Sequence, residues 1–241
     1  SIVDIEKMGV LDKWILSKSK TVFDEIEETF RNYEFSKGLN KLNNFLVVDL
    51  SGIYMDICKD RLYCDDKNDI HRTSSQSAMA IIAKKLIHTL APILTYTMDE
   101  LLTYAPEIIK EGVTDVFDIA KYEIPEIGSS LNAELLLKAK EKFSEAIDVL
   151  KKDKVIKNTL ELTLYTNSKE ILALNSVEIE DWFIVSGITH DTQKDAIIKY
   201  EIDGSLFEVY KSVEAKCPRC WKFNSKNEES LCVRCNDVVN K

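Results

Sequence analysis

Residues 11–30, LDKWILSKSKTVFDEIEETF, indicate the fold most directly. Apolar side chains recur there at helical spacing: Leu11, Ile15, Val22, Ile26 and Phe30. The pattern predicts an amphipathic helix over roughly residues 8–32, with one face turned toward a core. The same spacing continues in three later segments, residues 35–46, 50–63 and 79–90. Together these segments predict an antiparallel helix bundle.

In the second half of the chain, the spacing of the apolar residues changes. Residues 133–152 predict one more long helix, after which Leu160–Leu164 alternate with polar neighbours as in a strand. Residues 182–188 are read as a second strand. Asp203-Gly204 lies between two apolar runs, a pattern typical of a hairpin turn.

The expected architecture is therefore mainly α and α+β overall. We expect a helix bundle in residues 1–130, a small mixed α/β unit in residues 131–213 and a four-cysteine zinc ribbon in residues 214–241. No apolar run approaches the roughly 18 residues that a membrane span needs, and no secretory signal opens the chain. A cytoplasmic protein without membrane contact is expected.

The charge is unevenly distributed. The formal net charge of −9 alone argues against binding nucleic acid, because phosphates are bound by Lys and Arg. Residues 211–241, however, hold seven basic and four acidic residues, so this end is about +3 and the remainder about −12.

Four cysteines near this end give the most specific signal in the sequence. Cys217-Pro-Arg-Cys220 and Cys232-Val-Arg-Cys235 supply two thiolate pairs, which suits a tetrahedral Zn²⁺ ion. Two disulfides or unligated thiols, and a redox iron site of rubredoxin type, are the alternatives. A closed four-thiolate site leaves no position for water, so the predicted zinc is structural.

Cations surround this predicted site. They are Lys216, Arg219, Lys222 and Arg234, and Trp221 lies next to the second ligand. A basic patch with an aromatic ring suits RNA, whose bases stack and whose phosphates attract cations. Alternatively, the cations neutralise the thiolates and Trp221 packs on the metal loop.

A second group of cations, Lys59, Arg61 and Arg72, could meet a phosphate backbone. Composition alone favours a solvated face, with local salt bridges to nearby aspartates. No P-loop, dinucleotide fingerprint or nucleophile elbow occurs in the sequence.

Several of these segments resemble bacterial isoleucyl-tRNA synthetases. Residues 49–63, DLSGIYMDICKDRLY, carry the resemblance most clearly. It extends to LDKW at 11–14, RTSSQ at 72–76, LAPILTYTMDE at 90–100, residues 153–161 and the CPRCW segment at 217–221 with its second cysteine pair.

The resemblance implies the C-terminal part of a larger enzyme that joins isoleucine to its tRNA using ATP and Mg²⁺. The family's two nucleotide-binding signatures and its editing domain have no counterpart here, so the chain alone is expected to be inactive. ATP and Mg²⁺ would belong to the missing catalytic domain, a further expected partner. The first bundle helix is expected to be truncated, and the protein to be a monomer.

The resemblance also implies tRNA-binding positions: Lys59, Arg61, Arg72, Arg219, Trp221 and Arg234. The basic patch adds Lys222 to this set. The rival hypothesis is a zinc-stabilised module that docks on protein without touching RNA. Three positions depart from the family pattern: Lys13, where relatives carry arginine, Lys157, where many carry glycine, and Lys222, where a histidine often stands.

Overall fold

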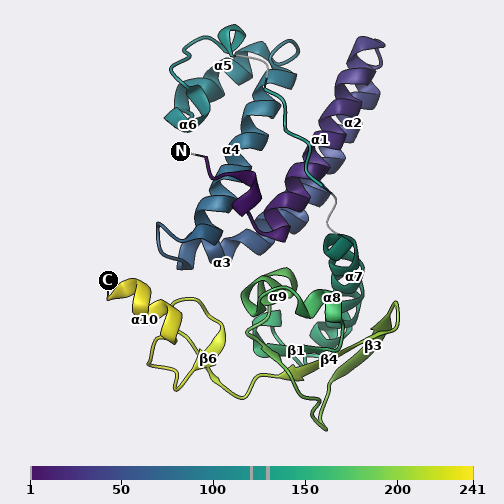
Figure 1. Ribbon diagram of the computed structural model, residues 1–241, viewed down its shortest axis with the longest axis vertical. Coiled ribbons are helices and arrows are strands. Elements are labelled where there is room, and N and C mark those ends of the chain that lie inside the picture. The colour runs from purple at the N-terminus through teal and green to yellow at the C-terminus, as the bar shows by residue number, and fades with distance from the viewer. Residues whose placement is uncertain (1, 120–121, 129–130, 241) are drawn as a thin grey trace. The chain divides into compact units, whose positions relative to one another are not determined.

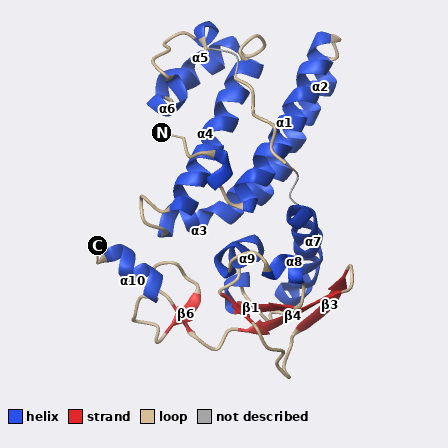
Figure 2. Cartoon of the chain, viewed as in Figure 1, coloured by secondary structure: helices blue, strands red, loops and turns tan. Residues whose placement is uncertain are grey.

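The computed structural model of the chain describes residues 2–119, 122–128 and 131–240 (Figure 1). Its contacts group into two compact units. The bundle unit consists of Ser1–Asp56 and Lys67–Ser129, and the mixed unit of Ile57–Asp66 and Ser130–Lys241. Helices predominate, and the strands lie in the second half of the chain (Figure 2). The predicted mainly α, α+β class is confirmed.

Every regular element among the described residues of the bundle unit is helical. They are η1 (Ile5–Lys7), α1 (Val10–Arg31), α2 (Phe35–Asn44), the π-helix η2 (Phe45–Met55), α4 (Ile70–Leu90), α5 (Thr95–Tyr104), α6 (Glu107–Lys110) and η3 (Val116–Asp118). The predicted helix over residues 8–32 is confirmed as α1, which packs against α2 and α4. Its apolar stripe supplies Leu11, Ile15 and Ile26 to the core.

A buried polar cluster ties three helices of the bundle unit together. The Tyr54 hydroxyl of η2 donates to Asp12 Oδ1 of α1 at 2.6 Å, and Ser75 Oγ of α4 donates to the same oxygen at 3.0 Å. All three residues are essentially excluded from solvent. Because an unsatisfied buried carboxylate is costly, these bonds favour one arrangement of α1, η2 and α4.

The predicted helix over residues 50–63 is divided. The wide turns of η2 end at Met55, and α3 (Asp56–Cys64) continues from there. A Cβ at Gly52 would lie 3.0 Å from the Val47 carbonyl oxygen, so a larger residue here would require the backbone of the π-helical turn to shift slightly. An apolar stripe does not distinguish α-helical from π-helical hydrogen bonding, which is why the sequence pattern did not indicate the change.

Helices, a four-stranded sheet and a two-stranded sheet of β5 (Ala215–Lys216) and β6 (Phe223–Ser225) make up the mixed unit. Besides residues 57–64 of α3, its helices are α7 (Leu131–Lys152), η4 (Thr159–Glu161), α8 (Lys169–Leu172), α9 (Ser176–Phe183) and α10 (Val233–Val239). The four-stranded sheet has the order β2 (Gly187–Thr189), β1 (Leu162–Thr166), β4 (Ser205–Lys211) and β3 (Ile198–Ile202). β1 is parallel to β2 and antiparallel to β4.

Two sequence predictions in this unit have different outcomes. The hairpin is confirmed, because Asp203 and Gly204 join β3 to β4 with φ angles of 49° and 77°. The prediction that a strand begins at residue 182 is wrong. Residues 182 and 183 belong to α9, and the strand β2 begins only at Gly187. Asn175 caps α9 by accepting from the Glu178 N–H at 2.8 Å, and the helix then buries Trp182.

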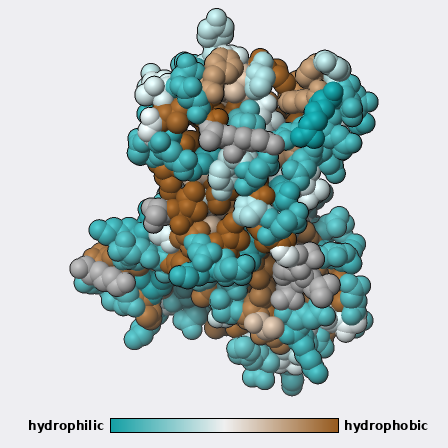
Figure 3. Space-filling model, turned by 45° about the horizontal axis from the view of Figure 1, so that its top comes forward, coloured by the Kyte–Doolittle hydropathy of each residue, from teal (hydrophilic) through white to brown (hydrophobic). Residues whose placement is uncertain are grey.

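The contacts group α3 with residues 130–241, so the C-terminal half of the chain does not fold around its own residues alone. The predicted boundaries at residues 130 and 213 remain predictions. Figure 3 shows hydrophilic residues over much of the visible face, with apolar residues gathered in patches. Among the described helices, none combines the length and the apolar character that crossing a membrane requires.

Candidate metal centre

Short elements bring the four cysteines together. Cys217 and Cys220 lie in the turn between β5 (Ala215–Lys216) and β6 (Phe223–Ser225). Two backbone bonds close this turn: Cys217 N donates to Lys222 O at 2.9 Å, and Trp221 N to Cys217 O at 3.0 Å. The second pair lies at the start of α10, with Cys232 directly before the helix.

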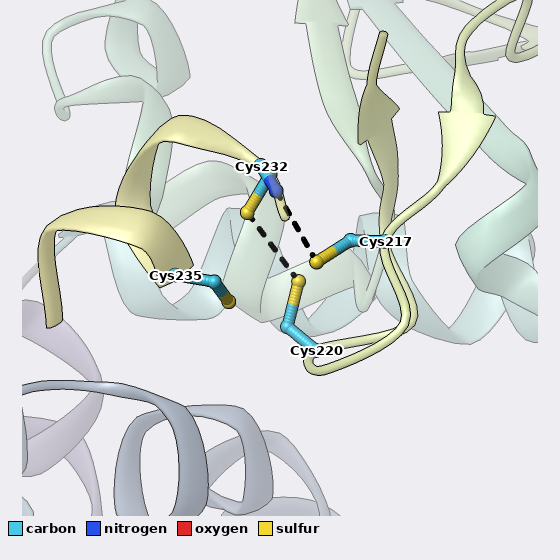
Figure 4. A group of neighbouring side chains, drawn as sticks. All are labelled: Cys217, Cys220, Cys232 and Cys235. Carbon is cyan, nitrogen blue, oxygen red and sulfur yellow. Dashed lines mark hydrogen bonds between the residues drawn. The ribbon is translucent and has the colours of Figure 1, made fainter. Parts of the chain in front are cut away.

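The four sulfur atoms point toward one another (Figure 4). All lie within 4.8 Å of one another, and Cys220 Sγ and Cys232 Sγ are 3.8 Å apart. A tetrahedral ion with Zn–S bonds of about 2.3 Å places its ligands about 3.8 Å apart, which fits this spacing. All six cysteines of the chain are free thiols, so the disulfide alternative is not supported.

The surroundings act differently on the individual thiols: burial raises the pKa of Cys220 and Cys232, whereas the pKa of Cys217 is lowered. Burial raises the pKa of the Cys217 thiol, but the backbone N–H groups of residues 232, 220 and 219 outweigh it and lower this pKa to about 6. Arg219 Nη1 donates to Cys235 Sγ at 3.4 Å. Such hydrogen bonds to sulfur are characteristic of metal–thiolate sites. The four buried cysteines therefore fit a metal ion that prefers soft ligands.

Three of the predicted RNA-binding cations around the centre turn toward protein. Arg219 Nη1 donates to the Cys64 carbonyl oxygen at 2.7 Å. Lys222 is buried and its ammonium lies 2.9 Å from Glu180 Oε2. Arg234 binds Asp60 through both guanidinium nitrogens, at 2.6 and 2.8 Å. The structure thus brings these cations to α3 and α9.

Trp221 and Lys216 are arranged differently, because both are exposed. The Trp221 side chain is 61% exposed and the Lys216 ammonium lies 5.5 Å from its ring centroid, a cation–π contact. Trp221 also has a φ of 65°, in the left-handed region that glycine tolerates best. The alternative expectation was that Trp221 packs on the metal loop. Packing would bury the ring, whereas most of this residue is exposed.

The second predicted group is not a single cationic face. Lys59 is exposed on α3, whereas Arg61, two residues later, is 1% exposed. Arg61 Nε donates to Asp181 Oδ2 at 2.6 Å, and this carboxylate is itself buried. Arg72 is half-buried in α4 of the bundle unit.

Four acidic partners of these cations were not predicted as site residues: Asp60, Asp65, Glu180 and Asp181. The sequence places Asp60 and Asp65 near Arg61 and suggests local salt bridges, but both lie about 170 positions before their partner Arg234. Cys64 was not predicted as part of the site, but it packs in one buried cluster with the four cysteines. Burial raises its pKa to about 11.

The fold and this centre define the class of protein. Residues 12–172 match the family described as "Anticodon-binding domain of tRNA ligase", and the chain belongs to this family.

Its relatives narrow the class further. The chain is 66% identical over 239 residues to the isoleucine–tRNA ligase of Aliarcobacter butzleri (strain RM4018), covering 99% of this chain and 26% of that protein. It is 51% identical over 240 residues to the isoleucine–tRNA ligase of Sulfurimonas denitrificans, covering 100% and 26%. The enzyme of Campylobacter concisus is 48% identical over 243 residues, with 99% and 26% covered. The chain spans about a quarter of the length of these relatives, and the resemblance to isoleucyl-tRNA synthetases is confirmed.

Proposed function

We propose that this chain recognises the anticodon arm of isoleucine tRNA as part of an isoleucine–tRNA ligase. The observation that carries the proposal is the match of residues 12–172 to an anticodon-binding family, within a chain similar to isoleucine–tRNA ligases along its whole length. Ligation of isoleucine with ATP and Mg²⁺ would be the activity of the larger protein, and the chain alone would not aminoacylate. We place that protein in the cytoplasm, as a monomer.

The metal in this proposal is one structural Zn²⁺ per chain, held by Cys217, Cys220, Cys232 and Cys235. Support comes from their burial, from the 3.8 Å sulfur spacing and from the hydrogen bonds to Cys217 and Cys235. With four protein ligands, Zn²⁺ would leave no open position for substrate. It would stabilise a segment that is too short to form an apolar core.

RNA contact is assigned to exposed Trp221 and Lys59 and half-buried Arg72 of the predicted set, and to Lys216, which is exposed beside Trp221. Trp221 offers a ring on which an unstacked base can lie, and Lys216 beside it offers a cation for phosphate. Lys59 and Arg72 are proposed as further phosphate contacts. Arg61, Arg219, Lys222 and Arg234 would act on RNA only through the protein groups that they bind.

A direct titration tests this proposal. The reduced, metal-loaded chain is titrated with an isoleucine-accepting tRNA transcript and with a non-cognate transcript, each at several salt concentrations. We expect tighter binding of the cognate tRNA, and affinity that falls steeply with salt because bound phosphates release counterions. Equal affinity for both transcripts, or an affinity that salt does not change, would overturn it.

A second candidate is a docking module that contacts protein but not RNA. The inward direction of Arg219, Lys222 and Arg234 favours it, because each binds the mixed unit itself. The same titration separates the two functions. A correctly folded, metal-loaded chain that binds neither transcript would support the docking module.

A further inference from the structure

The cysteine-rich segment is attached to α3 at each of its metal-binding turns. In the first turn, Arg219 lies between Cys217 and Cys220 and donates to the Cys64 carbonyl oxygen at 2.7 Å. In the second turn, Arg234 lies between the two cysteines and reaches Asp60. A turn that is fixed at its metal end and at α3 has little freedom to rotate, so its exposed face has a defined direction.

Asp60 receives the attachment of the second turn and also lies near the first. Both of its carboxylate oxygens accept from Arg234, at 2.6 and 2.8 Å, in the planar geometry that only arginine provides. Lys222, on the first turn, lies 3.8 Å from Asp60 Oδ2. One carboxylate of α3 thus binds Arg234 directly and attracts Lys222, whose hydrogen bond goes to Glu180 at 2.9 Å.

The cations around Asp60 already have carboxylate partners within the protein. Two cations, Lys222 and Arg234, share three carboxylates: Asp60, Asp65 and Glu180. The Arg234 side chain is 29% exposed and that of Lys222 5%. A cluster with more acidic than basic groups repels a phosphate, so these cations are poorly suited to contact RNA directly.

Lys222 directly follows Trp221, and Lys216 lies over the Trp221 ring. Any rotation of the first turn away from α3 would therefore move the ring and the exposed ammonium together. Burial raises the pKa of Asp60, but the hydrogen bonds and charge of Arg234 and the charge of Lys222 outweigh it and lower this pKa. Asp60 is thus held in the charged form that keeps the attachment closed.

We infer that Asp60 is a positioning residue for RNA binding: by holding Arg234 and Lys222, it sets the direction in which the metal segment presents Trp221 and Lys216. This inference rests on the proposed tRNA-binding function. It gives the chain an acidic residue whose loss weakens the binding of a polyanion. Simple electrostatics predicts the opposite, since removing a negative charge should strengthen that binding.

The test compares Asp60→Asn with Asp237→Asn, which removes an exposed carboxylate of the same segment. Each metal-loaded variant of the full chain is titrated with the isoleucine-accepting transcript over a salt series. We expect Asp60→Asn to weaken binding about fivefold to a hundredfold, the value of one misplaced stacked base, without changing the salt slope. Asp237→Asn should leave the affinity unchanged or slightly increase it.

A second variant, Arg234→Lys, keeps the inference testable if Asp60→Asn fails to fold. It keeps the positive charge and loses only the bidentate bond to Asp60. Positioning predicts weaker binding with an unchanged slope, and an Asp60→Asn/Arg234→Lys double variant no weaker than the worse single variant. A phosphate contact predicts unchanged binding for Arg234→Lys. Metal content and the thermal midpoint are measured for every variant.

The two claims fail separately. If the unsubstituted chain binds no tRNA, the proposed function fails and this inference falls with it. If the unsubstituted chain binds and metal-loaded Asp60→Asn binds equally well or more tightly, only the positioning role is overturned. Unchanged affinity of Arg234→Lys would overturn it as well.

Discussion

The bundle unit and the cysteine-rich segment, residues 214–240, stabilise their folds by different means. Helix α1 alone buries Leu11, Ile15, Leu16, Phe23 and Ile26. Among the described residues of the cysteine-rich segment, the four cysteines are the buried apolar side chains. One region thus buries hydrocarbon on several helices, and the other gathers sulfur and pairs charges.

The difference reflects the size of each region. A bundle of long helices removes enough apolar surface from water to stabilise itself, and its surface charges can vary. A segment of under thirty residues cannot, so it needs directional contacts with a fixed geometry. Those contacts also fix the orientation of whatever the segment presents, which suits a recognition surface. The predictions below separate the two means of stabilisation.

Removing the metal should have the largest effect. A structural zinc contributes about 10–16 kcal/mol of binding free energy, so Cys235→Ser or a strong chelator should unfold residues 214–240. Amide hydrogen exchange of the whole chain checks this, with metal content as control. We expect fast exchange in the cysteine-rich segment and unchanged protection in α1 and α4. Retained protection in the segment after complete metal loss would contradict the proposed role of the metal.

Removing hydrocarbon from the bundle should destabilise the bundle and leave the metal content unchanged. Phe23 is fully buried, with its ring centroid 6.0 Å from that of Phe45. Phe23→Ala should lower the free energy of unfolding by about 3–5 kcal/mol and leave one metal per chain. Urea denaturation measures the loss, and Val47→Ala, at a 58% exposed position, is the matched control. A metal-depleted Phe23→Ala protein would show that the two regions are not separable.

Substitution of Arg61 tests whether this buried cation stabilises the fold or binds RNA. Its partner Asp181 is as buried as Arg61 itself, and breaking such a pair costs about 3–5 kcal/mol. Arg61→Met should therefore lower the free energy of unfolding without changing the salt slope of tRNA binding. Lys59→Met, at an exposed position on the same helix, should do the reverse. If Arg61→Met is fully stable and reduces the slope, Arg61 contacts phosphate after all.

Trp221→Gly should have the smallest effect on stability. Glycine relieves the left-handed φ of 65°, so the free energy of unfolding should change by no more than about 1 kcal/mol. Loss of the ring should nevertheless weaken tRNA binding by about 1–3 kcal/mol. Trp221→Phe keeps an aromatic ring and should restore part of the affinity. Full affinity for the glycine variant would remove Trp221 from the RNA contacts.

Local patterns predicted much of the fold. The stripe from Leu11 to Ile26 predicted α1, and Asp203-Gly204 predicted the β3–β4 hairpin, because both depend on neighbours in sequence. The strand over residues 182–188 failed because the buried end of a helix and a buried strand look alike in a short apolar run. The π-helical turns of η2 also left no signal in the spacing.

In the candidate site, too, contacts between neighbours in sequence were predictable and contacts between distant residues were not. The spacing of the cysteine pairs was enough to predict that four thiols would meet. The two cysteines of each pair are close in sequence, and two such pairs supply the four ligands of one metal ion. The partners of the nearby cations were not predictable, because Arg234 binds a carboxylate 174 positions away. Sequence distance carries no information about such a pair.

By itself, the sequence determined the helical class, the four-thiol centre and the family of the protein. These depend on local periodicity, on ligand spacing and on residues shared with relatives. Only the tertiary structure decided which cations face outward. Lys59 and Arg61 are both basic residues on α3, but the path of the chain exposes the first and buries the second against Asp181. Charge is a property of a residue, whereas access to RNA is a property of the packed molecule.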